Sequence, residues 1–213
     1  MHADRLTSFL TDWYGSPPVE PTPVEGALPL ALRRWYGCVQ AWGDPLTRQN
    51  YMIAAKDLVE DDGYVVFYVE NQNVCEWAFR VGDEDPEVFD RECRSNQPWE
   101  PIGERLEDFL FHVAAFETVF SQWCINWLDL DAAQVQSVVS PMRLLATTTW
   151  GWPGPNTSFY RQDGVLAMAA ANQPVDAPVT EDSRWLLFVG CRSQDDLDAF
   201  DRPGLPEPDY RAP

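Results

Sequence analysis

The stretch VFYVENQNVCEWAF, residues Val66–Phe79, decides how the fold of this chain is interpreted. Both of its ends are rich in β-branched and aromatic residues, which favour strands. The residues between them, Glu70–Asn73, suit a turn, because Asn side chains hydrogen-bond turn backbone and tolerate positive φ. The stretch therefore predicts an antiparallel hairpin, with one strand from Tyr64 to Val69 and its partner from Val74 to Val81.

The polar turn of this hairpin also raises the question of a reactive site. Asn and Gln side chains lack a pKa useful for proton transfer. The chain holds only two histidines, His2 and His112, and neither lies near the turn in sequence. We therefore predict that the hairpin is a scaffold with Trp77 packed in the core. We also expect Asn71→Ala to destabilise the fold more than it alters specific contacts.

Helices are predicted where apolar residues recur at a spacing of three and four positions. Such stripes run from about Ala3 to Tyr14, through LPLALRRWYG from Leu28, and from 106 to 120, the clearest of the three. Gly37 and Gly43 are alternative ends for the second helix. Four prolines between residues 16 and 23 predict an extended connector before it.

The second half of the chain is predicted to add more strands and one short helix. Residues 142–149 resemble a strand, TSFYRQDGVLAMAA a hairpin centred on Asp163-Gly164, and RWLLFVGC a buried strand. SQDDLDAF predicts a short helix with Ser193 as its N-cap. In the first half, the polar segment from Gly82 to Pro101 is expected to be a loop.

These elements predict an α+β fold of one domain over residues 1–213. We expect a central, mostly antiparallel sheet with helices packed at the N-terminus and on one face. The core is expected over about residues 26–201, and the proline-rich residues 202–213 are predicted to be a flexible tail. With 45% hydrophobic and 13% aromatic residues, including 10 Trp, the chain has enough apolar surface to fold.

The net charge of −19, from 34 acidic and 15 basic residues, limits the partners of the chain. It disfavours nucleic acid and anionic membranes, because phosphate contacts need Lys or Arg. It is consistent both with solubility alone and with a basic protein partner. There is no run of about 18 apolar residues and no secretory signal, so we expect a cytoplasmic protein that does not enter a membrane.

The search for catalytic or metal-binding residues gives a largely negative result. The five cysteines are scattered without a C-x-x-C pair, which argues against a disulfide framework or a zinc site and favours small buried residues. His112 lies between apolar neighbours and is interpreted as a structural or surface histidine. We predict no catalytic residues, no metal and no cofactor. Trp150 and Trp152 could form a recognition surface, but rings of that size favour covering the edge of the core.

Four features in order resemble the SUKH superfamily, the Smi/Knr-type domain. LPLALRRWYG resembles its early helix and VFYVENQNVCEWAF its central hairpin. DPEVF, followed by Pro98-Trp99, resembles its acidic-Pro-x-Val loop, and RLEDFLFHVAAFE the helix that covers its sheet. Together they span roughly residues 26–120. Further on, the strand and helix LLFVGCRSQDDL fit the same architecture.

This resemblance implies a non-enzymatic binding protein. Bacterial members are mostly immunity proteins, each of which blocks a partner toxin, often a nuclease, by occlusion. The family has no catalytic residues to carry over. A basic toxin domain would suit the charge of this chain, and we expect contacts through two acidic segments. Their residues are Glu60, Asp61, Asp62, Asp83, Glu84, Asp85 and Glu87.

Two other functions stay open. An intracellular scaffold or regulatory module would resemble the fungal members of the family and would not need a toxin gene beside its own. A hydrolase that uses paired carboxylates has weaker support, because such pairs have no recognisable spacing in sequence.

Overall fold

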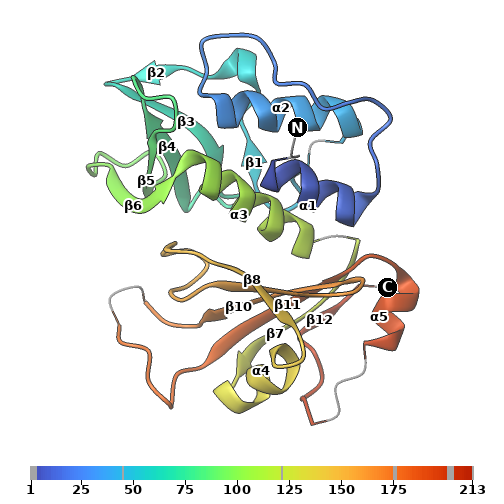
Figure 1. Ribbon diagram of the computed structural model, residues 1–213. Coiled ribbons are helices and arrows are strands. Elements are labelled where there is room, and N and C mark those ends of the chain that lie inside the picture. Colours follow the sequence, from blue (N-terminus) through green and yellow to red (C-terminus); the bar gives the residue numbers. More distant parts are fainter. Residues whose placement is uncertain (1–3, 45, 121, 175–176, 201–203, 213) are drawn as a thin grey trace. The chain divides into compact units, whose positions relative to one another are not determined.

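The computed structural model describes residues 4–44, 46–120, 122–174, 177–200 and 204–212. The chain divides into two compact units, Met1–Ala114 and Ala115–Pro213 (Figure 1). Each unit contains helices and a six-stranded sheet in which every strand pairing is antiparallel. The α+β class is therefore confirmed. The one central sheet expected from the sequence is replaced by two, because the strands of each unit pair only among themselves.

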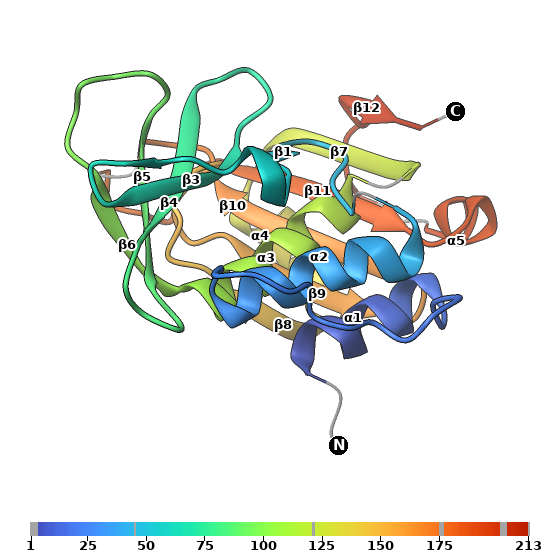
Figure 2. The same ribbon diagram turned by 90° about the horizontal axis from the view of Figure 1, so that it is seen from above.

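The first unit consists of a sheet with helices on one side (Figures 1 and 2). Its strands are β1 (Tyr51–Met52), β2 (Glu60–Asp61), β3 (Tyr64–Val69), β4 (Cys75–Arg80), β5 (Glu87–Glu92) and β6 (Glu100–Arg105). They follow the order β1-β3-β4-β5-β6, and β2 pairs with β3. Its helices are α1 (Arg5–Tyr14), α2 (Leu30–Trp42), the short 3-10 helix η1 (Ala55–Asp57) and the first part of α3 (Leu106–Val119).

The core of this unit begins before residue 26. The stripe predicted in the first helix is confirmed, because Leu6, Phe9, Leu10 and Trp13 are all buried. The Phe9 ring meets Phe111 of α3 edge-on at 5.6 Å between ring centroids. The predicted start of the core at about residue 26 is therefore wrong: an amphipathic helix of this kind is stabilised by burying its apolar face.

The predicted hairpin is confirmed as β3 and β4, and a carboxylate organises its turn. Glu70 is only 3% exposed. One of its carboxylate oxygens accepts hydrogen bonds from the backbone N–H groups of Gln72 (2.7 Å) and Val74 (3.1 Å). Asn73 adopts the positive φ of 58° that the turn requires. Asn71 has a different role: its backbone N–H donates to Asn50, and its buried Oδ1 has no hydrogen-bond partner among the described residues.

We expect Glu70→Ala to lower the free energy of unfolding by about 1–3 kcal/mol, because two backbone donors lose a charged acceptor. Chemical denaturation of the full chain measures this change. Asn71→Ala is the matched control and should cost less than about 0.5 kcal/mol, since it removes an oxygen that accepts no bond. This replaces the expectation that Asn71 stabilises the turn. An equal loss in both variants would contradict the role given to Glu70.

The second unit contains the other sheet and two short helices. Its strands are β7 (Trp123–Leu130), β8 (Arg143–Thr147), β9 (Ser158–Gln162), β10 (Val165–Ala171), β11 (Trp185–Cys191) and β12 (Tyr210–Arg211), in the order β12-β7-β11-β10-β9-β8. Its helices are α4 (Ala132–Val139) and α5 (Gln194–Ala199). The predicted capping of the last helix is confirmed, because the Ser193 side chain accepts from the Asp196 N–H.

The tryptophans of TTWGWPGP contribute to packing in this unit. Trp150 is 2% exposed and Trp152 is half-buried. Both rings contact Phe116, at centroid distances of 6.1 and 5.3 Å. This confirms that they cover part of the core.

Residues 204–212 do not form the flexible tail expected from their prolines. Tyr210 and Arg211 pair with β7, and the Ala212 N–H donates to the Cys124 carbonyl at 2.7 Å. The Asp209 carboxylate accepts from the Leu128 N–H at 2.7 Å. Tyr210 and Arg211 are held in a strand because their backbone pairs with the edge of β7, a tertiary contact that the proline-rich composition does not predict.

Candidate functional site

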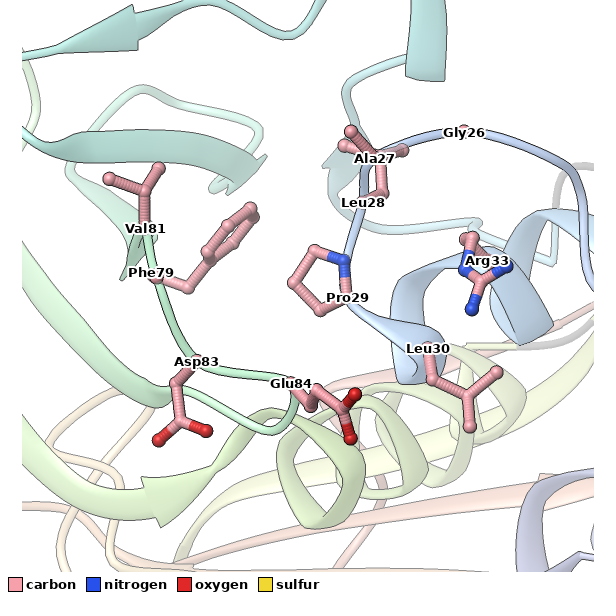
Figure 3. A pocket seen from close by; sticks show the side chains of 11 residues that line it. Gly26, Ala27, Leu28, Pro29, Leu30, Arg33, Phe79, Val81, Asp83 and Glu84 are labelled. Carbon is pink, nitrogen blue, oxygen red and sulfur yellow. The ribbon is translucent and has the colours of Figure 1, made fainter.

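The first unit contains an open groove of about 420 Å³ between the segment that leads into α2 and the end of β4. Apolar groups from both sides line it, and Figure 3 shows the rings of Pro29 and Phe79 facing each other across it. Leu30 and Val81 keep 38% and 43% of their surface exposed. Charged residues complete the lining: Arg33 on the α2 side, and Asp83 and Glu84 on the β4 side.

A glycine in the middle of α2 positions one wall of this groove. A Cβ on Gly37 would lie 2.2 Å from the Thr22 carbonyl oxygen, so only glycine lets the proline-rich connector pass this close. The Val24 N–H then donates to the Arg33 carbonyl at 3.0 Å. The helix continues through Gly37 and ends at Gly43, whose φ of 65° is left-handed. Of the two ends that the sequence allowed, the structure selects Gly43.

The register of three strands brings the two predicted acidic segments to the same end of the sheet. Asp61 of β2 pairs with Tyr64 of β3, which pairs with Arg80 of β4. The Val81 N–H donates to the Gly63 carbonyl at 3.0 Å, so the two turns are directly hydrogen-bonded. The exposed acidic residues gathered there are Glu60, Asp61, Asp62, Asp83 and Glu84. We call these five residues the acidic end.

The other two predicted contact residues have roles within the fold. Asp85 accepts the Glu107 N–H at 3.1 Å through its carboxylate, which satisfies a free N–H in the first turn of α3. Its carbonyl accepts from Arg105 at 3.0 Å. Glu87 begins β5, is half-buried and lies opposite Arg105 in the ladder. Arg105 also pairs with Asp83 at 3.3 Å, between two exposed side chains.

His112 is a buried residue of α3. It is 6% exposed, and its Nδ1 lies 2.9 Å from an oxygen of Glu104, which is 7% exposed. The sequence leaves a structural or a surface position open for His112, and the structure shows the buried one. The other histidine, His2, lies outside the described residues.

Burial raises the pKa of the thiols of Cys38, Cys75, Cys93 and Cys124, which favours their neutral form. Burial raises the pKa of Cys38 to about 11, and burial followed by the nearby Glu76 raises the pKa of Cys93 to about 11. The pKa values of Cys75 and Cys124 are also raised by burial. Because the thiolate is the nucleophile, these shifts oppose reactivity near neutral pH.

The part of the chain that the structure describes lacks two features, a metal-binding cluster and a membrane-spanning helix. Within it, no group of three or more His, Cys, Asp or Glu side chains is placed to hold a metal ion. None of its helices combines the length and the apolar character needed to cross a membrane.

The environment of Asp90 in β5 opposes ionisation of its carboxyl group. Burial, followed by repulsion from Glu100, raises the pKa of Asp90 from 3.8 to about 6. A raised folded-state pKa means that the folded chain binds the proton more tightly than the unfolded chain. The contribution of Asp90 to the free energy of unfolding is therefore largest below pH 3.8. It is lost as the pH rises through about 6.

We expect Asp90→Asn to stabilise the chain at pH 7.5 by about 1 kcal/mol, a value discounted for partial exposure. At pH 4 the variant and the parent should be nearly equal, since Asp90 is then protonated in the folded state. Denaturation at both pH values measures the difference. Asp61→Asn, at an exposed position, is the control that should change neither value. Destabilisation at pH 7.5 would contradict the raised pKa.

Comparison with protein-family models, with curated proteins and with solved structures finds no match for this chain. Three of the features that resemble the SUKH superfamily fall on α2, on the β3–β4 hairpin and on β5. The fourth, RLEDFLFHVAAFE, begins at the end of β6 and covers most of α3.

Proposed function

We propose that this chain is a non-enzymatic binding protein of the SUKH type that neutralises a basic bacterial toxin, such as a nuclease, by occluding it in the cytoplasm. One observation carries the proposal: two acidic segments separated in sequence meet at the acidic end, beside an open groove. The net charge of −19 gives the chain a field that attracts a basic partner. Such a field accelerates encounter, and apolar contacts then slow dissociation.

Co-expression with the product of the adjacent gene tests this function. We expect a stoichiometric complex on affinity purification and protection of cells from that product. With a nuclease partner, a molar equivalent of this chain should abolish DNA or RNA cleavage in vitro. If the adjacent product neither binds nor harms cells, the toxin-neutralising function is wrong. Capture of a harmless protein instead would support the scaffold alternative.

A further inference from the structure

The groove beside the acidic end is lined on two sides by exposed apolar side chains. Leu30 and Val81 are both large, exposed apolar side chains, and they stand on opposite sides of the same groove. Pro29 and Phe79 extend the apolar surface between them (Figure 3). Burying such side chains against a partner contributes about 25 cal/mol per Å² of apolar surface. The walls therefore favour an occupant with an apolar side chain.

Arg33 provides a hydrogen-bond donor in the same groove. Its Nε is buried and has no hydrogen-bond partner among the described residues. Because this Nε has almost no accessible surface, an occupant would be contacted by the other guanidinium N–H groups of Arg33, which lines the groove. A backbone carbonyl is an acceptor for these groups, and unlike a phosphate it adds no negative charge near the acidic end.

The charge at the other side of the groove selects among occupants. Glu84 lines the groove together with Leu30 (Figure 3), and Asp83 lies next to Glu84 in the chain. Glu84 is exposed and makes no ion pair among the described residues, whereas Asp83 is paired with Arg105. A cation is thus favoured here, and anionic ligands are disfavoured by the acidic end as a whole.

Together these features define one occupant. We propose that the groove binds an extended peptide segment of the basic partner, in which an apolar side chain lies between Leu30 and Val81. A Lys or Arg next to it in the segment pairs with Glu84, and a backbone carbonyl accepts from Arg33. The volume of about 420 Å³ lies at the lower end of the range of ligand pockets, which fits a short segment. This inference rests on the proposed function, because that function supplies a basic protein partner.

Two capped peptides test this inference on the full chain without the toxin. The first is acetyl-Gly-Leu-Lys-Gly-amide, and the second has Glu in place of Lys. In an NMR titration of the ¹⁵N-labelled chain, we expect the Leu-Lys peptide to shift the amides of Ala27, Leu28, Gly82 and Glu84 at millimolar concentration. The Leu-Glu peptide should bind at least about tenfold more weakly, because it brings a like charge to Glu84.

Two variants and one control make the result specific. Glu84→Lys should reverse the preference between the peptides, and Leu30→Glu should abolish binding of both. An acidic residue at position 30 suits the first turn of α2, which contains none, so this variant should fold. Leu144→Glu, at a 55% exposed apolar position of β8, should bind like the parent chain.

Several results would overturn the inference. They are equal binding of the two peptides, shifts confined to other amides, no shift at about 10 mM peptide, or binding of free leucine or lysine as tight as that of the peptide. Failure of the proposed function gives a different result. If the chain binds the Leu-Lys peptide but not the adjacent gene product, the peptide-binding groove is supported and the toxin-neutralising function is wrong. If Leu30→Glu and Glu84→Lys leave toxin affinity unchanged, the groove assignment alone is wrong.

Discussion

Replacing Trp77 with alanine is expected to lower the free energy of unfolding by about 3–5 kcal/mol. The side chain is 1% exposed and lies at the centre of the aromatic core of the first unit. Its ring is 5.1 Å from that of Tyr68 on the neighbouring strand and 6.0 Å from that of Phe109 on α3. The substitution leaves a cavity between strand and helix, where neighbouring groups relax only in part. It therefore tests the interpretation of the hairpin as a scaffold.

Trp99 provides the matched control, because it is a half-buried tryptophan of the same unit. Its ring stacks on Tyr64 at 5.5 Å, and the Arg91 guanidinium lies 4.0 Å from its centroid. We expect Trp99→Ala to cost about 1–2 kcal/mol, since it opens no enclosed cavity. Denaturation should be followed by hydrogen exchange of the amides in β3 and β4, because two compact units need not unfold as one. Similar losses in both variants would contradict the scaffold interpretation.

The prediction of this hairpin shows what sequence alone determines. The content of β-branched and aromatic residues predicts both strands, and the polar residues between them predict the turn. The function of Glu70 was missed, because a charged residue in a turn is usually exposed. Its burial follows from the backbone donors that the turn directs at it. The preference for Asn71 came from residue type, whereas the positive φ falls on Asn73.

The sequence does not predict several other elements, among them β5, β6, β7, α4 and β12, and in β5 and β12 tertiary pairing overrides local composition. EVFDRE, predicted within a loop, forms β5 between β4 and β6. Only Val88 in it is fully buried, so its charged residues hide the alternation of a strand. Tyr210 and Arg211 form β12 in a proline-rich segment, since the edge of β7 offers free backbone groups. Neither signal lies within a short window of sequence.

The sequence predicts the acidic residues of the candidate site, but it does not predict that the two acidic segments lie together beside a groove. The acidic segments were identified from composition, but their meeting depends on the pairing of Tyr64 with both Asp61 and Arg80. The groove was not predicted, because Leu30 and Val81 are apolar residues in elements that suggested only core. A usable signal was Gly37, whose presence inside a helix indicates a close approach of the backbone. That approach places the connector that leads to the groove.

Reversing charge at three residues of the acidic end should slow association with a basic partner by about 10–100-fold at low ionic strength. The variant combines Glu60→Lys, Asp61→Lys and Glu84→Lys, all at exposed positions. The rate constant of dissociation should change less than the rate constant of association does, because Glu60 and Asp61 do not line the groove and such exposed charges act mainly on encounter. The salt dependence of association should also become flatter, since added salt screens an attraction that the variant has lost.

The choice of residues separates steering from folding. Asp62 has a φ of 50°, which lysine tolerates poorly. Asp83 pairs with Arg105, and Asp85 accepts the Glu107 N–H, so reversing either would also disturb the fold. For this reason these three residues stay unchanged, although all of them belong to the predicted contact set.

A second triple variant, of equal charge change, decides whether the place of the charges matters. It combines Glu181→Lys, Asp182→Lys and Glu207→Lys, at exposed positions of the second unit. The association rate constants of the two variants with the toxin are measured by stopped flow at about 20 and about 200 mM salt. The higher concentration shortens the Debye length and so screens the attraction between the charges. If net charge alone governs encounter, both variants slow equally and the acidic end has no special role. If the acidic end faces the toxin, only the first variant loses most of the rate, because steering depends on charge near the contact surface.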